Sequence, residues 1–90
     1  MMGRRETMVR WYPFNPERFS LDFDEEKLAA HGVSVKEAEQ VFEERLTVRR
    51  NKGHSDRYVI LGQTCAGRRL KLIVQPMPNR IIRVITGWPL

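Results

Sequence analysis

The chain has 90 residues, of which 41 % are apolar and 30 % charged, and its formal net charge is +5. This length predicts a single domain, residues 1–90, whose small core leaves little room for an elaborate site, and we expect no cofactor. Because no apolar run is long enough for a membrane span or a signal peptide, and Cys65 is the only cysteine, we expect a cytoplasmic protein without membrane contact or internal disulfide.

Residues 1–10 are predicted to be flexible, and regular structure is expected further along the chain. A short helix is predicted over residues 24–30, because Asp24 can cap its N-terminus and the acidic residues that follow suit the positive end of the helix dipole. Gly32 lies where a helix often ends in a left-handed conformation.

A second helix is predicted to begin at a capping box formed by Ser34 and Glu37. In this motif each of the two side chains accepts a hydrogen bond from the other residue's backbone N–H. Apolar residues then recur at helical spacing and form one stripe: Val35, Ala38, Val41 and Phe42. Acidic residues occupy most of the other positions, so this helix is expected to pack on the core with a solvated acidic outer face.

The spacing of apolar residues changes from 3.6 to 2 after Leu46, which predicts strands. Four are expected, over residues 46–49, 57–63, 68–75 and 81–88, joined by turns. Consecutive strands with short turns form an antiparallel meander, which cannot bury its apolar side alone. The predicted fold class is therefore α+β, with two N-terminal helices packed on a three- or four-stranded antiparallel meander sheet.

Charge is divided unevenly along the chain. Residues 1–45 contain 7 basic and 10 acidic side chains, a net charge of −3. Residues 46–90 contain 9 basic side chains and one acid, Asp56, a net charge of +8. Such asymmetry favours a polyanionic partner for the basic half. Two other interpretations stay open: the halves pair with each other inside the fold, or the basic half binds an acidic protein.

No zinc-site spacing, phosphate loop, nucleotide fingerprint or serine elbow is present, and we expect no metal. Basic and polar residues instead gather after position 50: Lys52, His54, Arg57, Tyr58, Arg68, Arg69, Lys71, Arg80 and Arg83. Arginine and lysine bind phosphates and can stabilise charge during phosphoryl transfer. Histidine or tyrosine could move the protons of metal-free RNA cleavage, in which the 2′-hydroxyl attacks its own phosphodiester. Exposed strands also carry such residues merely to remain solvated.

Several single residues have a second interpretation. His54 in a polar loop is more often solvated than a general base, and Tyr58 more often packs at the edge of the core than donates a proton. Arg83 is either functional or a partner in a cross-strand ion pair. Trp88 is expected to pack, whereas an exposed tryptophan would mark contact with a partner. Cys65 is interpreted as a small filler residue rather than a nucleophile, because the sequence marks no base for it.

Three segments in order, HGVSVKEAEQVFEERL, DRYVILGQTCAGRRLKLIV and RIIRVITG, resemble the BrnT family of type II toxins in the RelE-like ribonuclease superfamily. The resemblance covers residues 23–87 and implies a RelE/BrnT-like core over residues 23–88. It implies a toxin that inhibits translation by cleaving RNA without a metal, and a cognate antitoxin that holds it inactive in a homo- or hetero-oligomer. With the residue pattern, it gives catalytic candidates His54, Arg57, Tyr58 and Arg83. The RNA-binding candidates are Lys52, Arg68, Arg69, Lys71 and Arg80.

The final strand departs from the family pattern. It reads Ile85-Thr86-Gly87-Trp88 where an Ile-Ser-Ala-Arg-like run is expected, so the family's last arginine is absent. This absence favours the alternative function, a non-catalytic binding module of the same fold whose basic face binds nucleic acid or an acidic protein partner.

Overall fold

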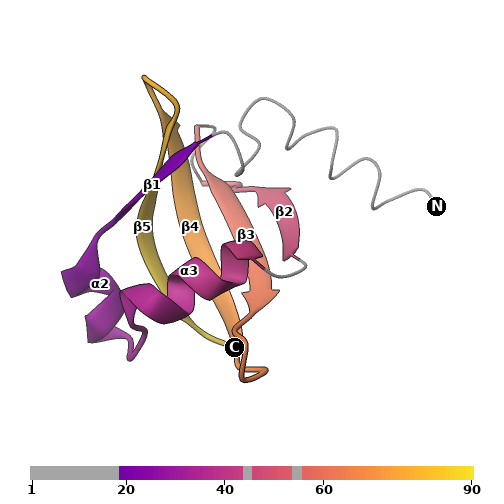
Figure 1. The fold of residues 1–90 in the computed structure, drawn as a ribbon. Helices are drawn as coiled ribbons and strands as arrows, with labels where there is room; N and C mark the ends of the chain where they lie inside the picture. The colour runs from indigo at the N-terminus through magenta and orange to yellow at the C-terminus, as the bar shows by residue number, and fades with distance from the viewer. Residues whose placement is uncertain (1–18, 44–45, 54–55) are drawn as a thin grey trace.

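The computed structural model describes residues 19–43, 46–53 and 56–90, and the segment expected to be flexible, residues 1–10, lies outside them. The elements follow in the order β1 (Ser20–Phe23), α2 (Glu25–Ala30), α3 (Val35–Glu43), β2 (Leu46–Arg50), β3 (Tyr58–Gln63), β4 (Arg69–Met77) and β5 (Ile81–Pro89) (Figure 1). The five strands of the described residues form one sheet in the order β1-β5-β4-β3-β2. β1 is parallel to β5, and all other neighbours are antiparallel.

The structure contradicts the predicted fold class. The sheet has five strands and is mixed, whereas a three- or four-stranded antiparallel meander was expected, and both helices are short. The strand missing from the prediction is β1, whose residues Ser20–Phe23 pair in parallel with residues 81–84 of β5. Four residues are too few to show a reliable alternation, and parallel pairing joins segments far apart in the sequence.

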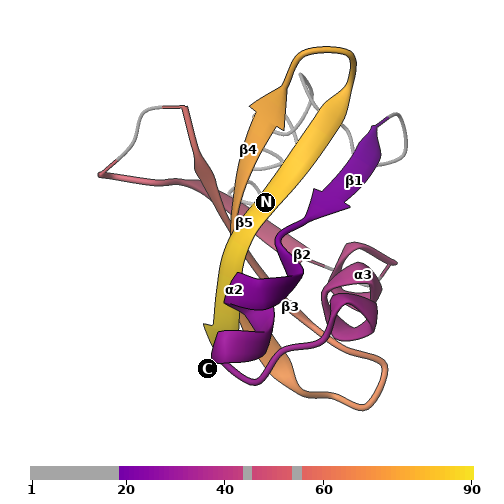
Figure 2. The same ribbon diagram turned by 90° about the vertical axis from the view of Figure 1, so that its left-hand side faces the viewer.

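Both helices lie on the same face of the sheet, where α2 packs against β5 and α3 packs across β3 and β4 (Figures 1 and 2). The predicted caps are confirmed. The Asp24 side chain accepts a hydrogen bond from the Lys27 N–H at 3.1 Å, and Ser34 and Glu37 form the reciprocal bonds of a capping box. Gly32 has φ 77°, the left-handed conformation expected after α2.

The core lies between the helices and the sheet surface that they cover, here called the core face. It consists of buried apolar side chains from both layers: Leu28, Val33, Ala38, Val41, Val48, Ile60, Leu70, Leu72, Val74, Ile82 and Val84. The strand register explains the sheet half of this set, because Val48, Ile60 and Leu72 are paired neighbours across β2, β3 and β4. The predicted stripe of α3 is confirmed, with Ala38 and Val41 fully buried.

A β-bulge interrupts β5 at Ile85. Val84 pairs with Val74 of β4, and Thr86 pairs with Ile73, so Ile85 is an extra residue between two consecutive pairs. Successive side chains of a strand alternate between faces, and one inserted residue reverses that alternation for everything beyond it.

The bulge assigns the last residues of β5 to faces opposite to those that simple alternation predicts. Val84 faces the core before the bulge, and alternation would turn Trp88 the same way. Instead Gly87 is buried, directly against Leu28 and Leu72 of the core. Trp88 lies on the opposite surface of the sheet, here called the outer face.

Gly87→Ala is expected to lower the free energy of unfolding by about 1–3 kcal/mol, the usual cost of overpacking a core. A Cβ at this position would overlap Leu72 Cδ2 and lie 3.2 Å from Leu28 Cδ2 and 3.0 Å from the Lys71 carbonyl oxygen. Thermal denaturation followed by circular dichroism measures the effect, and each kcal/mol corresponds to about 4–8 °C in a domain of this size.

Gly53→Ala is the matched control, because a Cβ at Gly53 would meet its nearest atom, Asn51 Oδ1, at an ordinary distance of 3.6 Å. Equal melting temperatures for the two variants would contradict the close packing inferred at Gly87.

Candidate nucleic-acid interface

The outer face carries no helix of the described residues (Figures 1 and 2). It contains an open hollow of about 710 Å³. This volume falls within the range of ligand sites. Apolar and aromatic side chains form its floor, here called the apolar floor: Val59, Leu61, Ile73, Ile85, Trp88 and Leu90. Cationic side chains also line it and are here called the basic rim: Arg49, Arg50, Lys52, Arg57 and Lys71. Asn51 and Thr86 complete the lining, and none of its described residues carries a carboxylate side chain.

Strand register brings these residues together from four strands. Arg49, Val59 and Ile73 form one row of paired neighbours across β2, β3 and β4. Lys71 and Trp88 are neighbours in the next row, on β4 and β5. The central strands are thus apolar on both faces, and most of the positive charge lies toward the β2 side of the sheet.

Few contacts neutralise the basic rim within the part of the chain that the structure describes. Arg57 donates a hydrogen bond from Nε to Gln75 Oε1 at 3.3 Å, and Gln75 Nε2 donates to Asp56 Oδ2 at 3.0 Å. Lys71 Nζ lies 5.4 Å from the centroid of the Trp88 ring, within the range of a cation–π contact. The ion pairs of the described residues, Arg68–Glu37 and Arg83–Asp22, include no member of the rim.

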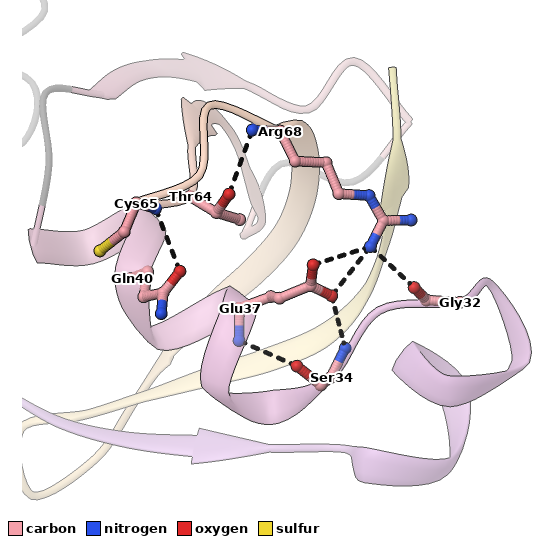
Figure 3. A network of polar contacts seen from close by, with 7 residues as sticks. All are labelled: Gly32, Ser34, Glu37, Gln40, Thr64, Cys65 and Arg68. Carbon is pink, nitrogen blue, oxygen red and sulfur yellow. Dashed lines mark hydrogen bonds and ion pairs between the residues drawn. The ribbon is translucent and has the colours of Figure 1, made fainter.

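Arg68 holds the helices to the sheet (Figure 3). Its Nη1 donates to the two carboxylate oxygens of Glu37 at 2.8 and 2.9 Å and to the Gly32 carbonyl oxygen at 3.0 Å. Glu37 simultaneously accepts from the Ser34 N–H at 3.1 Å, and its own N–H donates to Ser34 Oγ at 3.0 Å. The Glu37 carboxylate therefore caps α3 and also anchors this helix to Arg68, the residue just before β4.

The side chain of Arg68 also changes the acidity of its partner. The Arg68 hydrogen bond, and after it the bond from the Ser34 backbone, lower the pKa of Glu37 below the ordinary value of 4.5. Both favour the charged carboxylate, and they outweigh the desolvation that acts in the opposite direction.

Two further hydrogen bonds fix the hairpin between β3 and β4 beside this network (Figure 3). Thr64 Oγ1 accepts from the Arg68 N–H, and Gln40 Oε1 accepts from the Cys65 N–H, each at 3.1 Å. Cys65 is therefore held through its backbone, and its side chain is exposed.

The structure brings three of the sequence candidates together at the hollow, namely Lys52, Arg57 and Lys71. It adds Arg49 and Arg50 of β2, which are not among the sequence candidates. One feature could have identified them: both arginines lie at the end of β2, and β2 pairs with β3, which begins directly after Arg57.

The other catalytic candidates are dispersed. Tyr58 packs against the core, and its register partner on β4 is the buried Val74. Arg83 pairs with Asp22 of β1, Nη1 to Oδ2 at 3.3 Å, which is the cross-strand ion pair left open as an alternative. His54 lies outside the described residues.

The remaining RNA-binding candidates lie away from the hollow. Arg68 is engaged by Glu37, Arg69 is exposed at the start of β4, and Arg80 is exposed in the turn between β4 and β5. None of the three contributes to the lining.

No protein-family model matches the chain, and neither a curated protein nor a solved structure is detectably similar to it. Among the described residues, no helix is long and apolar enough to cross a membrane, and no three His, Cys, Asp or Glu side chains gather as they would around a metal ion. The candidate interface therefore rests on the geometry of this chain.

Glu37→Gln is expected to destabilise the fold by about 1 kcal/mol at neutral pH, because glutamine can still accept from the Ser34 N–H but loses the charge-assisted bonds to Arg68. The pKa of Glu37 is lowered by folding, so its stabilising contribution is complete above the unfolded pKa, near 4.5. That contribution disappears as the pH falls through the folded pKa. The difference in melting temperature between wild type and variant should therefore shrink below about pH 4.

Glu39→Gln, at an exposed position of the same helix, is the control and should change the melting temperature little at any pH. A Glu37→Gln deficit that stays constant from neutral to acidic pH would argue against the charged capping network.

Proposed function

We propose that this protein binds RNA through the hollow on the outer face of its sheet. The observation that supports this most directly is the lining, whose described residues include five cations and no carboxylate side chain. Arginine and lysine recognise phosphate through charge-assisted hydrogen bonds, and a concentration of one charge sign attracts a polyanion over a distance. The net charge of +8 over residues 46–90 acts in the same direction.

Internal charge pairing explains the asymmetry less well. Within the described residues it involves two ion pairs, Arg68–Glu37 and Arg83–Asp22, and both lie outside the hollow. Among the described residues, the cations of the basic rim therefore form no ion pair with a carboxylate.

We further propose that RNA binding serves the function implied by the resemblance to BrnT toxins. The protein would be a cytoplasmic, metal-independent ribonuclease, inhibited by a cognate antitoxin with which it forms an oligomer. Arg57 is the strongest catalytic candidate, because it lines the hollow and follows the loop that carries Lys52 and His54. In this mechanism Arg57 binds the scissile phosphate, and His54 transfers the protons of attack by the 2′-hydroxyl.

A second candidate function is RNA binding without cleavage. It is favoured by the burial pattern of Tyr58, which packs against the core, and by the ion pair that engages Arg83. Trp88 also occupies the strand position at which the family pattern has its last arginine. Fewer polar groups would then surround the phosphate than metal-free cleavage calls for.

Lys52→Gln combined with Lys71→Gln is expected to weaken binding of single-stranded RNA about tenfold at fixed salt. The probe is a fluorescent oligonucleotide with methylated 2′-hydroxyls, which removes the attacking group of the proposed cleavage. Each lost phosphate contact should reduce the slope of log affinity against log salt by about 0.7, and the double variant by about 1.4.

Lys27→Gln combined with Lys36→Gln removes the same charge from exposed positions of the helices and should leave affinity and slope nearly unchanged. Equal losses in the two double variants would mean that net charge alone attracts the RNA, and the hollow would then have no special role.

Purified protein is expected to cleave unmodified RNA in the presence of EDTA and to arrest growth when expressed. Arg57→Ala and His54→Gln should each reduce the cleavage rate about 100-fold or more, since both contributions are made in the transition state. If RNA and translation both stay intact while a toxin of known activity works in the same assay, the ribonuclease proposal fails and the binding function remains.

A further inference from the structure

The floor of the hollow is apolar, although a surface that binds only phosphates has no need of apolar groups. Val59 and Leu61 of β3 and Ile73 of β4 occupy its centre, between the arginines of β2 and the end of β5. Such strand positions on the solvent side of a sheet are usually polar. Their residue types suggest a partner that buries apolar or aromatic surface as well as negative charge.

Among the described residues of this lining, Trp88 is the one aromatic residue, and the bulge at Ile85 is what brings it to the outer face. Its indole is half-buried and lies next to the side chains of Lys71 and His31. Lys71 Nζ is 5.4 Å from the ring centroid, and the His31 ring lies at 5.5 Å with an interplanar angle of 53°. A cation therefore lies over the face of a planar ring at one end of the hollow.

We propose that the hollow takes an unpaired segment of RNA, with a base stacked on Trp88 and neighbouring bases against the apolar floor. This inference rests on the proposed function, because it specifies which form of RNA the hollow binds. The phosphates of the same segment lie against the basic rim, with Lys71 beside the base that stacks on Trp88.

An unpaired strand is the form of nucleic acid that can contact both the basic rim, through its phosphates, and the apolar floor, through its bases. In a duplex the bases stack on one another, so a duplex can offer the basic rim its phosphates but leaves the apolar floor uncovered. Unpaired bases expose their planar faces, and stacking on an aromatic side chain is tolerant of sequence because every base has such a face. An acidic peptide satisfies the rim by charge but has no obligatory planar ring for Trp88.

The wild-type protein distinguishes these cases by fluorescence anisotropy with four probes of equal length. They are a single-stranded 2′-O-methyl oligonucleotide, the same strand annealed to its complement, a strand with the same phosphates but abasic sugars, and polyglutamate. We expect the single strand to bind at least about tenfold more tightly than each of the other three, the size of effect produced by one or two stacked bases.

Variants at Trp88 test the platform itself. Trp88→Leu should weaken single-strand binding about 5- to 100-fold and leave duplex binding unchanged, whereas Trp88→Phe should retain most of the affinity because it keeps a ring. Trp11→Phe leaves Trp88 as the sole tryptophan of the chain, and its fluorescence should then be quenched by the single strand and unaffected by the abasic strand. The comparison of probes on wild type holds even if Trp88→Leu unfolds.

The outcomes separate this inference from the proposed function. Equal affinity for the intact, annealed and abasic strands would overturn stacking while RNA binding stands. Polyglutamate binding as tightly as the single strand would overturn it in favour of an acidic protein partner. No binding of any nucleic-acid probe would overturn the proposed function and this inference together.

Discussion

The extra residue at Ile85 determines both surfaces of the sheet at the end of β5. Because the bulge reverses the alternation, Gly87 faces the core, where Leu72 of β4 lies too close for any Cβ at this position and Leu28 of α2 packs tightly beside it. The next residue, Trp88, then faces outward beside Lys71. Without the extra residue, strict alternation would drive an indole into the contact between α2 and the sheet. Helix packing and the proposed RNA platform therefore depend on one insertion.

A division of charge between the two layers follows from how the helices are attached. Glu37 gives its carboxylate both to the cap of α3 and to Arg68, so the helix layer is held on the core face and the outer face keeps its cations. The other acids of α3, Glu39 and Glu43, are exposed. A polyanion is repelled from this acidic layer and attracted to the opposite side of the sheet. On the proposed function, the acidic helix layer thus directs the RNA toward the outer face.

Local patterns in the sequence predict local structure here, and they fail where distant segments meet. The capping box of Ser34 and Glu37 and the stripe on α3 depend on spacings of three and four residues, and both are present in the structure. The parallel pairing of β1 with β5 depends on segments at opposite ends of the described chain, and no pattern in Ser20–Phe23 announces it. No sequence pattern predicts the bulge either, because Ile85 continues an apolar run. The candidate site could not be predicted from local patterns for the same reason. Lys52, Arg57 and Lys71 lie near the arginines of β2 only because of the register across β2, β3 and β4.

The residue that departs most from the toxin pattern occupies a consequential position. Trp88 stands where the resemblance expects an arginine, and the bulge turns that position into the hollow rather than into the core. Exchanging a guanidinium for an indole removes a group that would contact phosphate and adds one that would contact a base. On the proposed function, the loss of this arginine weakens binding of the scissile phosphate, and Trp88 adds a preference for unpaired strands. Under this proposal, cleavage depends on Arg57 and strand selection on Trp88, so either property can persist without the other.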